Sequence, residues 1–144
     1  MADSYEFHAG VEWRGKRLCE AFVGKERKSR GIVSPAVEFN GLEGAQNPEE
    51  MLVEALASCL LFTFLHFVSK NEINLISYRN QVTGDLIKGK SGFAFTKFRI
   101  HLDITVRKGH KEKAEEAAHL AERFCLVSNS LSGEKELEFV IKEE

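Results

Sequence analysis

The feature that most constrains the fold is one long apolar segment with a helical start, NPEEMLVEALASCLLFTFLHF at residues 47–67. Asn47 suits the N-cap, Pro48 suits the first helical position, and Glu50 is placed for a capping box. From Met51 onward apolar residues occur on every side of the expected helix, which predicts burial nearly all round. A chain of 144 residues has little material to wrap such a helix, so we expect it to pack against a second copy of itself.

Composition and charge indicate an ordinary soluble protein. Hydrophobic residues make up 43% and charged residues 29%, and the formal net charge of -2 argues against a general nucleic-acid binder. The apolar run from Ala55 to Val68 is shorter than the about 20 residues that cross a bilayer, and the N-terminus lacks a signal-peptide pattern. Three widely spaced cysteines do not form a secreted disulfide framework. We therefore expect a single cytoplasmic domain over residues 1–144, without a membrane or nucleic-acid partner.

The remaining segments predict an α+β class. A hairpin turn is expected at Arg14–Gly15, and a phase change in the alternation of apolar residues predicts a bulge at Thr96–Lys97. A second helix is expected from about His110 to Phe124, followed by a polar turn. Strands are expected over residues 4–13, 16–24, 31–39, 76–87, 93–106 and 136–143.

Cys59 and Cys125 are the candidate reactive groups. Each falls on the inward side of an expected helix, so packing could bring them together. A buried cysteine is most often a small apolar core residue, and that interpretation stays open for Cys59. A pair with His66 is disfavoured, because two helical turns place it about 10 Å away along the axis. The cysteines and histidines show no metal-ligand spacing and Cys19 has no evident role, so we expect neither a metal nor a bound cofactor.

Two motifs carry a resemblance to a known family. NPEEMLVEALASC resembles the helix signature of the OsmC/Ohr family, the osmotically inducible and organic-hydroperoxide-resistance thiol peroxidases, and CLVSNSL resembles the family's second-cysteine motif. The order of the elements agrees over almost the whole chain. The resemblance implies an OsmC-like fold, with antiparallel sheets around a long buried central helix, in an intertwined homodimer with two active sites at the subunit interface. Leu126 is a departure, because the family often has proline there.

The resemblance also implies roles for individual residues. Cys59 matches the peroxidatic cysteine, Cys125 the resolving cysteine, and Glu49 the catalytic glutamate. The Cys59 thiolate would attack an organic hydroperoxide, or hydrogen peroxide as a further candidate, and become a sulfenic acid. Cys125 would then form a disulfide with it, which a lipoyl group or another external thiol would reduce. The alternative is a non-catalytic OsmC-like protein that binds an apolar small molecule at the dimer interface.

The resemblance also implies an arginine that stabilises the thiolate and is held by the glutamate. Its position in this sequence stays open. One branch of the family carries it in the loop before the helix, but residues 36–45 contain no arginine. The other branch carries it near the first hairpin turn, where WRGKR offers Arg14 or Arg17. We favour Arg14 as the arginine that stabilises the thiolate. The competing interpretation is that Arg14 is only a residue of the hairpin turn, and Arg27 and Arg30 remain candidates for the role.

Helix geometry adds an expectation about the dimer. Glu49 and Cys59 are ten residues apart in one helix, which is about 15 Å along its axis. A glutamate and an arginine cannot easily bridge that gap within one chain. We therefore expect the glutamate that acts on each Cys59 to come from the partner subunit.

Overall fold

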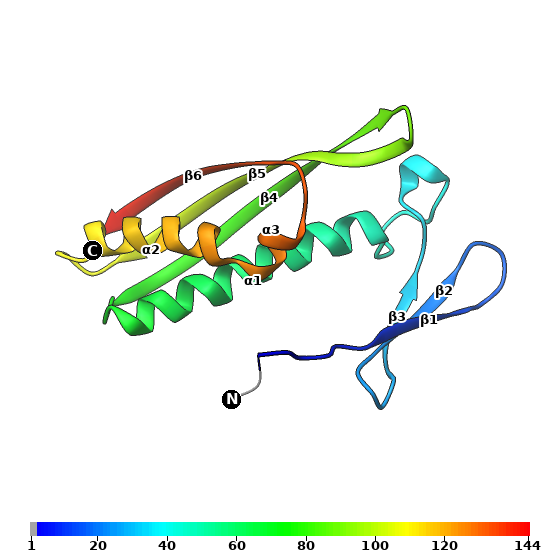
Figure 1. Ribbon diagram of the computed structural model, residues 1–144, viewed down its shortest axis with the longest axis horizontal. Coiled ribbons are helices and arrows are strands. Elements are labelled where there is room, and N and C mark those ends of the chain that lie inside the picture. The colour runs from blue at the N-terminus through cyan, green and yellow to red at the C-terminus, as the bar shows by residue number, and fades with distance from the viewer. Residues whose placement is uncertain (1–2) are drawn as a thin grey trace. The chain divides into compact units, whose positions relative to one another are not determined.

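The computed structural model describes residues 3–144, which divide between two compact units, Met1–Leu52 and Val53–Glu144 (Figure 1). The first unit holds an antiparallel sheet in the order β1-β2-β3. Its elements are β1 (Ala9–Trp13), β2 (Cys19–Val23), β3 (Lys28–Val33) and the 3-10 helix η1 (Val37–Phe39). The prediction of one domain over the whole chain stays a prediction.

The predicted hairpin turn between β1 and β2 is confirmed. The backbone N–H of Arg14 donates to Leu18 O at 2.9 Å, and Gly15 has a φ of 92°, a left-handed conformation that favours glycine. The third strand is shorter than predicted and ends at Val33. Pro35 lacks the N–H that a ladder needs, and the Ser34 hydroxyl accepts a bond from Leu42 N at 2.8 Å, which closes a loop instead.

The long helix α1 (Pro48–Lys70) begins where the capping residues predict. Asn47 is its N-cap: Glu50 N donates to Asn47 Oδ1 at 2.8 Å. Asn47 Nδ2 in turn donates to Glu50 Oε1 at 2.6 Å. The Glu50 carboxylate therefore reaches back, as predicted, although it meets the side-chain amide rather than the main-chain N–H of a capping box.

The second unit holds a three-stranded sheet in the order β4-β5-β6 together with two further helices. β4 and β5 form the predicted long hairpin, and the predicted bulge is confirmed, because Asp85 pairs with Lys97 and Leu86 pairs with Phe95. This leaves Thr96 as the extra residue. The elements after α1 are β4 (Leu75–Gly89), β5 (Gly92–Val106), α2 (Lys111–Phe124), α3 (Leu126–Ser130) and β6 (Glu134–Glu143).

The last strand departs from the expected antiparallel pairing. β6 runs parallel to β5, with Phe98 opposite Lys135 and Ile104 opposite Ile141. The connection through α2 and α3 returns the chain to the starting end of β5, which is the geometry of a parallel crossover. The expected polar turn after Cys125 is the short helix α3.

The core of the second unit lies between one face of the sheet and the two helices α1 and α2. Alternate residues of β5 face inward and alternate residues are exposed or half-buried, as the pattern of its apolar residues predicts. The buried side chains are Phe98, Ile100, Leu102, Ile104 and Val106 from β5, Leu56, Leu60 and Phe64 from α1, and Ala114, Ala117, Ala118 and Ala121 from α2.

Within one chain, α1 is not buried all round as predicted. One face packs in the core, while the side chain of Phe62 is 67% exposed and that of Leu65 is 36% exposed. By length and composition alone, the 23 residues of α1 could cross a bilayer. This differs from the prediction from sequence, which counted only the uninterrupted apolar run and found it too short. The core helix of a soluble protein meets the same criterion, and α1 buries Leu56, Leu60 and Phe64 in the core of the second unit.

Candidate active site

Two cysteine thiols meet in the second unit. Cys59 lies in the middle of α1 and is half-buried, whereas Cys125 is the fully buried N-cap of α3. Both are free thiols, and they are hydrogen-bonded to each other. The prediction that helix packing brings them together is confirmed, and their chemical roles stay predictions.

The environment of Cys59 favours its thiolate. Burial acts to raise the pKa of this thiol, but hydrogen bonds from Val127 N–H, the Cys125 thiol, the Thr63 hydroxyl and Leu126 N–H outweigh burial and lower the pKa below its ordinary value. These donors come from one turn further along α1 and from the first residues of α3. A lowered pKa raises the population of thiolate, the form of cysteine that acts as a nucleophile.

Cys125 is shifted in the opposite direction. The pKa of its thiol is raised to about 11, first by burial and then by the neighbouring Cys59 sulfur. Ser128 N, at 3.5 Å from Cys125 Sγ, offsets part of this effect. The pair is therefore asymmetric: Cys59 is the thiol that ionises, and Cys125 is the thiol that keeps its proton.

A polar pair that the sequence analysis missed lies beside the thiols. Asn80 Nδ2 donates to Ala57 O at 2.9 Å and to Tyr78 Oη at 2.8 Å, and the Tyr78 ring packs on Phe64 with centroids 5.2 Å apart. Burial raises the pKa of Tyr78, and Cys125 raises it further, so this tyrosine stays neutral near the thiols. The alternation along β4 was the available signal, because residues 78 and 80 share the inward face with Val82.

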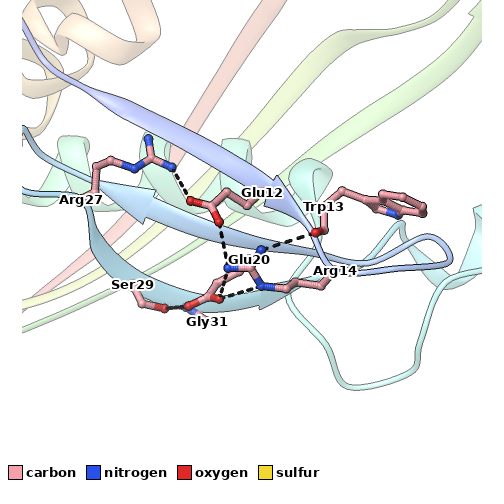
Figure 2. A network of polar contacts seen from close by, with 7 residues as sticks. All are labelled: Glu12, Trp13, Arg14, Glu20, Arg27, Ser29 and Gly31. Carbon is pink, nitrogen blue, oxygen red and sulfur yellow. Dashed lines mark hydrogen bonds and ion pairs between the residues drawn. The ribbon is translucent and has the colours of Figure 1, made fainter.

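Arg14, the favoured arginine, lies at the end of β1 in a network of carboxylates (Figure 2). Its guanidinium donates to Glu20 Oε1 at 2.8 and 3.1 Å and to Glu12 Oε1 at 3.1 Å. Arg27 donates to the other oxygen of Glu12, and the Ser29 hydroxyl donates to Glu20. Arg14 and Arg27 lower the pKa of Glu12, and Ser29 and Arg14 lower that of Glu20, so both carboxylates are charged and neutralise Arg14.

Arg17, the second candidate, lines an open cavity of about 460 Å³ in the first unit. Glu49 lines the same cavity, together with Trp13, Cys19 and Phe39. Arg17 Nη1 donates to Phe39 O at 2.7 Å, and Glu49 Oε1 is buried without a hydrogen-bond partner among the described residues. The first unit therefore places the predicted glutamate in one cavity with Arg17 rather than with Arg14.

The predicted site residues fall in both units. Cys59 and Cys125 belong to the second unit, and Glu49, Arg14 and Arg17 to the first, so one site that contains all of them stays a prediction. Over residues 3–144, no group of three or more His, Cys, Asp or Glu side chains is arranged to hold a metal ion.

Comparison with known proteins decides the family. A family model described as OsmC-like protein matches residues 41–140, a span that holds Glu49 and both cysteines of the pair. The chain belongs to the OsmC-like family. This OsmC-like protein is 28% identical over 143 residues to the uncharacterized protein YmaD of Bacillus subtilis (strain 168), a match that covers 96% of this chain and 93% of YmaD.

Solved structures agree with the OsmC-like fold. An OsmC-like protein of unknown function from Vibrio cholerae superposes with a TM-score of 0.84 at 24% identity, covering 95% of this chain and 100% of that one. An organic hydroperoxide resistance protein from Elizabethkingia anophelis superposes with a TM-score of 0.77 at 16% identity, covering 100% of both chains. The predicted family and its α+β fold are thereby confirmed.

Proposed function

We propose that this OsmC-like protein is a thiol-dependent peroxidase for organic hydroperoxides, with Cys59 as the peroxidatic and Cys125 as the resolving cysteine. The observation that carries the proposal is the contact of two thiols whose pKa values are shifted in opposite directions. A lowered pKa suits the thiol that attacks, and a raised pKa suits the thiol that must stay intact until it is needed. The structural likeness to a protein named for organic hydroperoxide resistance supports the same activity.

The proposed cycle has three balanced steps. The Cys59 thiolate attacks one oxygen of the peroxide, the O–O bond breaks, and the alkoxide that leaves takes up a proton to become an alcohol. Cys59 is now a sulfenic acid, and the Cys125 thiol attacks its sulfur to form a disulfide and release water. An external dithiol, a lipoyl group or a pair of small thiols, then reduces the disulfide by exchange and is itself oxidised. No step needs a bound cofactor.

The proposed active unit is a homodimer. One chain leaves Phe62 and Leu65 of α1 exposed, and a second copy of the same apolar helix has the matching chemistry to cover them. Cys59 and Glu49 lie ten residues apart on this helix, about 15 Å along its axis. In the proposed dimer, the glutamate that acts on each Cys59 therefore comes from the other subunit.

We further propose Arg17 as the arginine of this site. It lines the same cavity as Glu49, one of whose carboxylate oxygens is buried without a hydrogen-bond partner in the described part of the chain, whereas Arg14 is held by two carboxylates of its own sheet. A guanidinium beside the Cys59 thiolate would stabilise it further and orient the peroxide. With an external thiol reductant and free cysteines, the cytoplasm is the compartment that suits this chemistry.

A count of free thiols tests the peroxidase. The reduced protein is treated with a small excess of cumene hydroperoxide, and free thiols are titrated. We expect the wild type and Cys19→Ser each to lose two thiols, and Cys59→Ser to lose none. Cys125→Ser should lose one thiol and yield a sulfenic acid that dimedone labels. A wild type that keeps all its thiols would refute the proposal, and binding of an apolar ligand by such a protein would support the non-catalytic alternative.

Matched substitutions test the arginine. We expect Arg17→Gln to slow the reaction of Cys59 with cumene hydroperoxide by about tenfold or more, because one charge-assisted interaction with the thiolate is lost. Arg14→Gln should leave the rate within about twofold, because this guanidinium already serves two carboxylates. The reverse order of the two effects would return the role to Arg14.

A further inference from the structure

One hydroxyl beside the reactive thiol has no place in the cycle above. Thr63 lies one helical turn after Cys59 on α1. Its Oγ1 donates to the carbonyl oxygen of Cys59 at 2.8 Å. Residues four apart share one side of a helix, and the same hydroxyl lowers the pKa of the Cys59 thiol. Two acceptors on one residue therefore compete for the single hydrogen of this hydroxyl.

The free-energy cost of losing the bond from the Thr63 hydroxyl differs between the two acceptors. The carbonyl of Cys59 lies inside α1, where the backbone N–H of residue 63 already donates a hydrogen bond to it in the regular helical pattern. The hydroxyl bond to this carbonyl is a second one, and releasing it leaves no buried acceptor without a partner. The sulfur becomes a much stronger acceptor once it carries a charge.

We propose that Thr63 is a positioning residue for Cys59, whose hydroxyl turns from the carbonyl oxygen to the sulfur when the thiolate forms. The inference rests on the proposed function, because it concerns the residue assigned to peroxide attack. No proton is transferred in this step: the hydroxyl rotates about its Cβ–Oγ bond and keeps its hydrogen. The turned hydroxyl stabilises the negative charge and holds the sulfur in one rotamer.

The same helix offers a matched control. Serine and threonine in apolar helices often bond back to a carbonyl one turn earlier, with no further role. Ser58 does so, because its hydroxyl donates to Glu54 O at 3.0 Å. A purely structural role for Thr63 would make the two residues equivalent, so Ser58 separates general helix effects from an effect on the thiolate.

Other titratable groups face the thiol pair and stay unchanged in the test. Cys125 contacts the Cys59 sulfur from the start of α3, and Tyr78 of β4 interacts electrostatically with Cys125. Both are neutral around pH 7, because the pKa of each is raised. A change in the ionisation of Cys59 on substitution of Thr63 can then be assigned to the lost hydroxyl.

The experiment measures the pH dependence of Cys59 alkylation by iodoacetamide, read from the Cys59 peptide by mass spectrometry. We expect Thr63→Val, which keeps the shape and removes the hydroxyl, to shift the profile to higher pH and to slow alkylation at pH 7 by about tenfold. Thr63→Ser should restore the wild-type profile, and Ser58→Ala should not shift it. A wild-type profile in Thr63→Val, or an equal shift in Ser58→Ala, would overturn the inference.

The readout separates this inference from the proposed function. Alkylation needs only a thiolate, so the profile can shift as expected even if the wild type does not consume cumene hydroperoxide, and that outcome would refute only the peroxidase. If Thr63→Val does not fold, as judged by circular dichroism, Thr63→Ala removes the same hydroxyl with a better helix former. The same two outcomes then apply to Thr63→Ala.

Discussion

Leu126 offers a substitution that deletes one backbone hydrogen-bond donor and little else. It is the first residue of α3, and its N–H is bonded to the Cys59 sulfur. Proline fits the first position of a helix, and the preceding Cys125 has the extended conformation, with ψ of 116°, that a residue before proline adopts. The Leu126 side chain is 70% exposed, so its loss removes little packing. Leu126→Pro should therefore remove the N–H without distorting the turn.

The expected magnitude follows from the contact and its setting. A hydrogen bond to a charged group contributes about 1.5–3 kcal/mol, and 1.36 kcal/mol corresponds to about one pKa unit. Leu126 is the weakest of the four donors to Cys59, and this sulfur is partly open to solvent, which screens the interaction. We therefore expect the pKa of Cys59 to rise by about half a unit, which lowers its thiolate population at neutral pH about threefold.

The assay is the pH profile of iodoacetamide alkylation of Cys59, compared with Leu126→Ala. The alanine variant loses the same exposed side chain but keeps the N–H, so its profile should match that of the wild type. The reasoning would be refuted if the proline variant kept the wild-type profile. It would also be refuted if the alanine variant shifted as far as the proline variant.

Further predictions concern assembly, pH and stability. Phe62→Lys should raise the dissociation constant of the proposed dimer about tenfold or more in sedimentation equilibrium, because a charge replaces a contact-forming ring. Val140→Lys, on the outer face of the sheet, should leave it unchanged, and equal effects of the two substitutions would contradict the prediction. The rate with cumene hydroperoxide should rise with pH and level off at a lower pH than an ordinary cysteine requires, because the pKa of Cys59 is lowered; a rate that still climbs near pH 9 would argue against it. Asn47→Ala should cost about 1 kcal/mol of unfolding free energy in urea, and no loss would exclude the cap as a stabilising feature. Gly84→Ala should cost about 1–3 kcal/mol in the same assay, because its Cβ would lie 2.8 Å from Phe95 Cε1; an unchanged midpoint would show that the ring can move.

Local features of the fold could be predicted because a few neighbouring residues determine them. Asn47, Pro48 and Glu50 marked the start of α1, and the structure places the cap there. The phase change before Phe98 located the bulge at Thr96, because each residue of a strand must face either the core or solvent. The meeting of the two cysteines was predictable in the same way, from the inward side of each helix.

Features that depend on distant parts of the chain could not be predicted. The parallel pairing of β6 depends on where α2 and α3 return the chain, which no local pattern encodes. Arg14 and Arg17 are near neighbours in sequence, yet only the folded sheet shows that Glu12 and Glu20 converge on Arg14. The contact of the Leu126 N–H with the Cys59 sulfur likewise requires α1 and the start of α3 to be packed together.

The helix α1 combines two properties that bear on activity. It carries the thiol at its centre, and along its length it carries the apolar surface that a single chain leaves open to water. If the proposed dimer forms, dilution would dissociate it. Dissociation would expose both this apolar surface and the Cys59 sulfur to solvent. Turnover per subunit should therefore fall together with protein concentration, since the same helix governs both quaternary structure and reactivity.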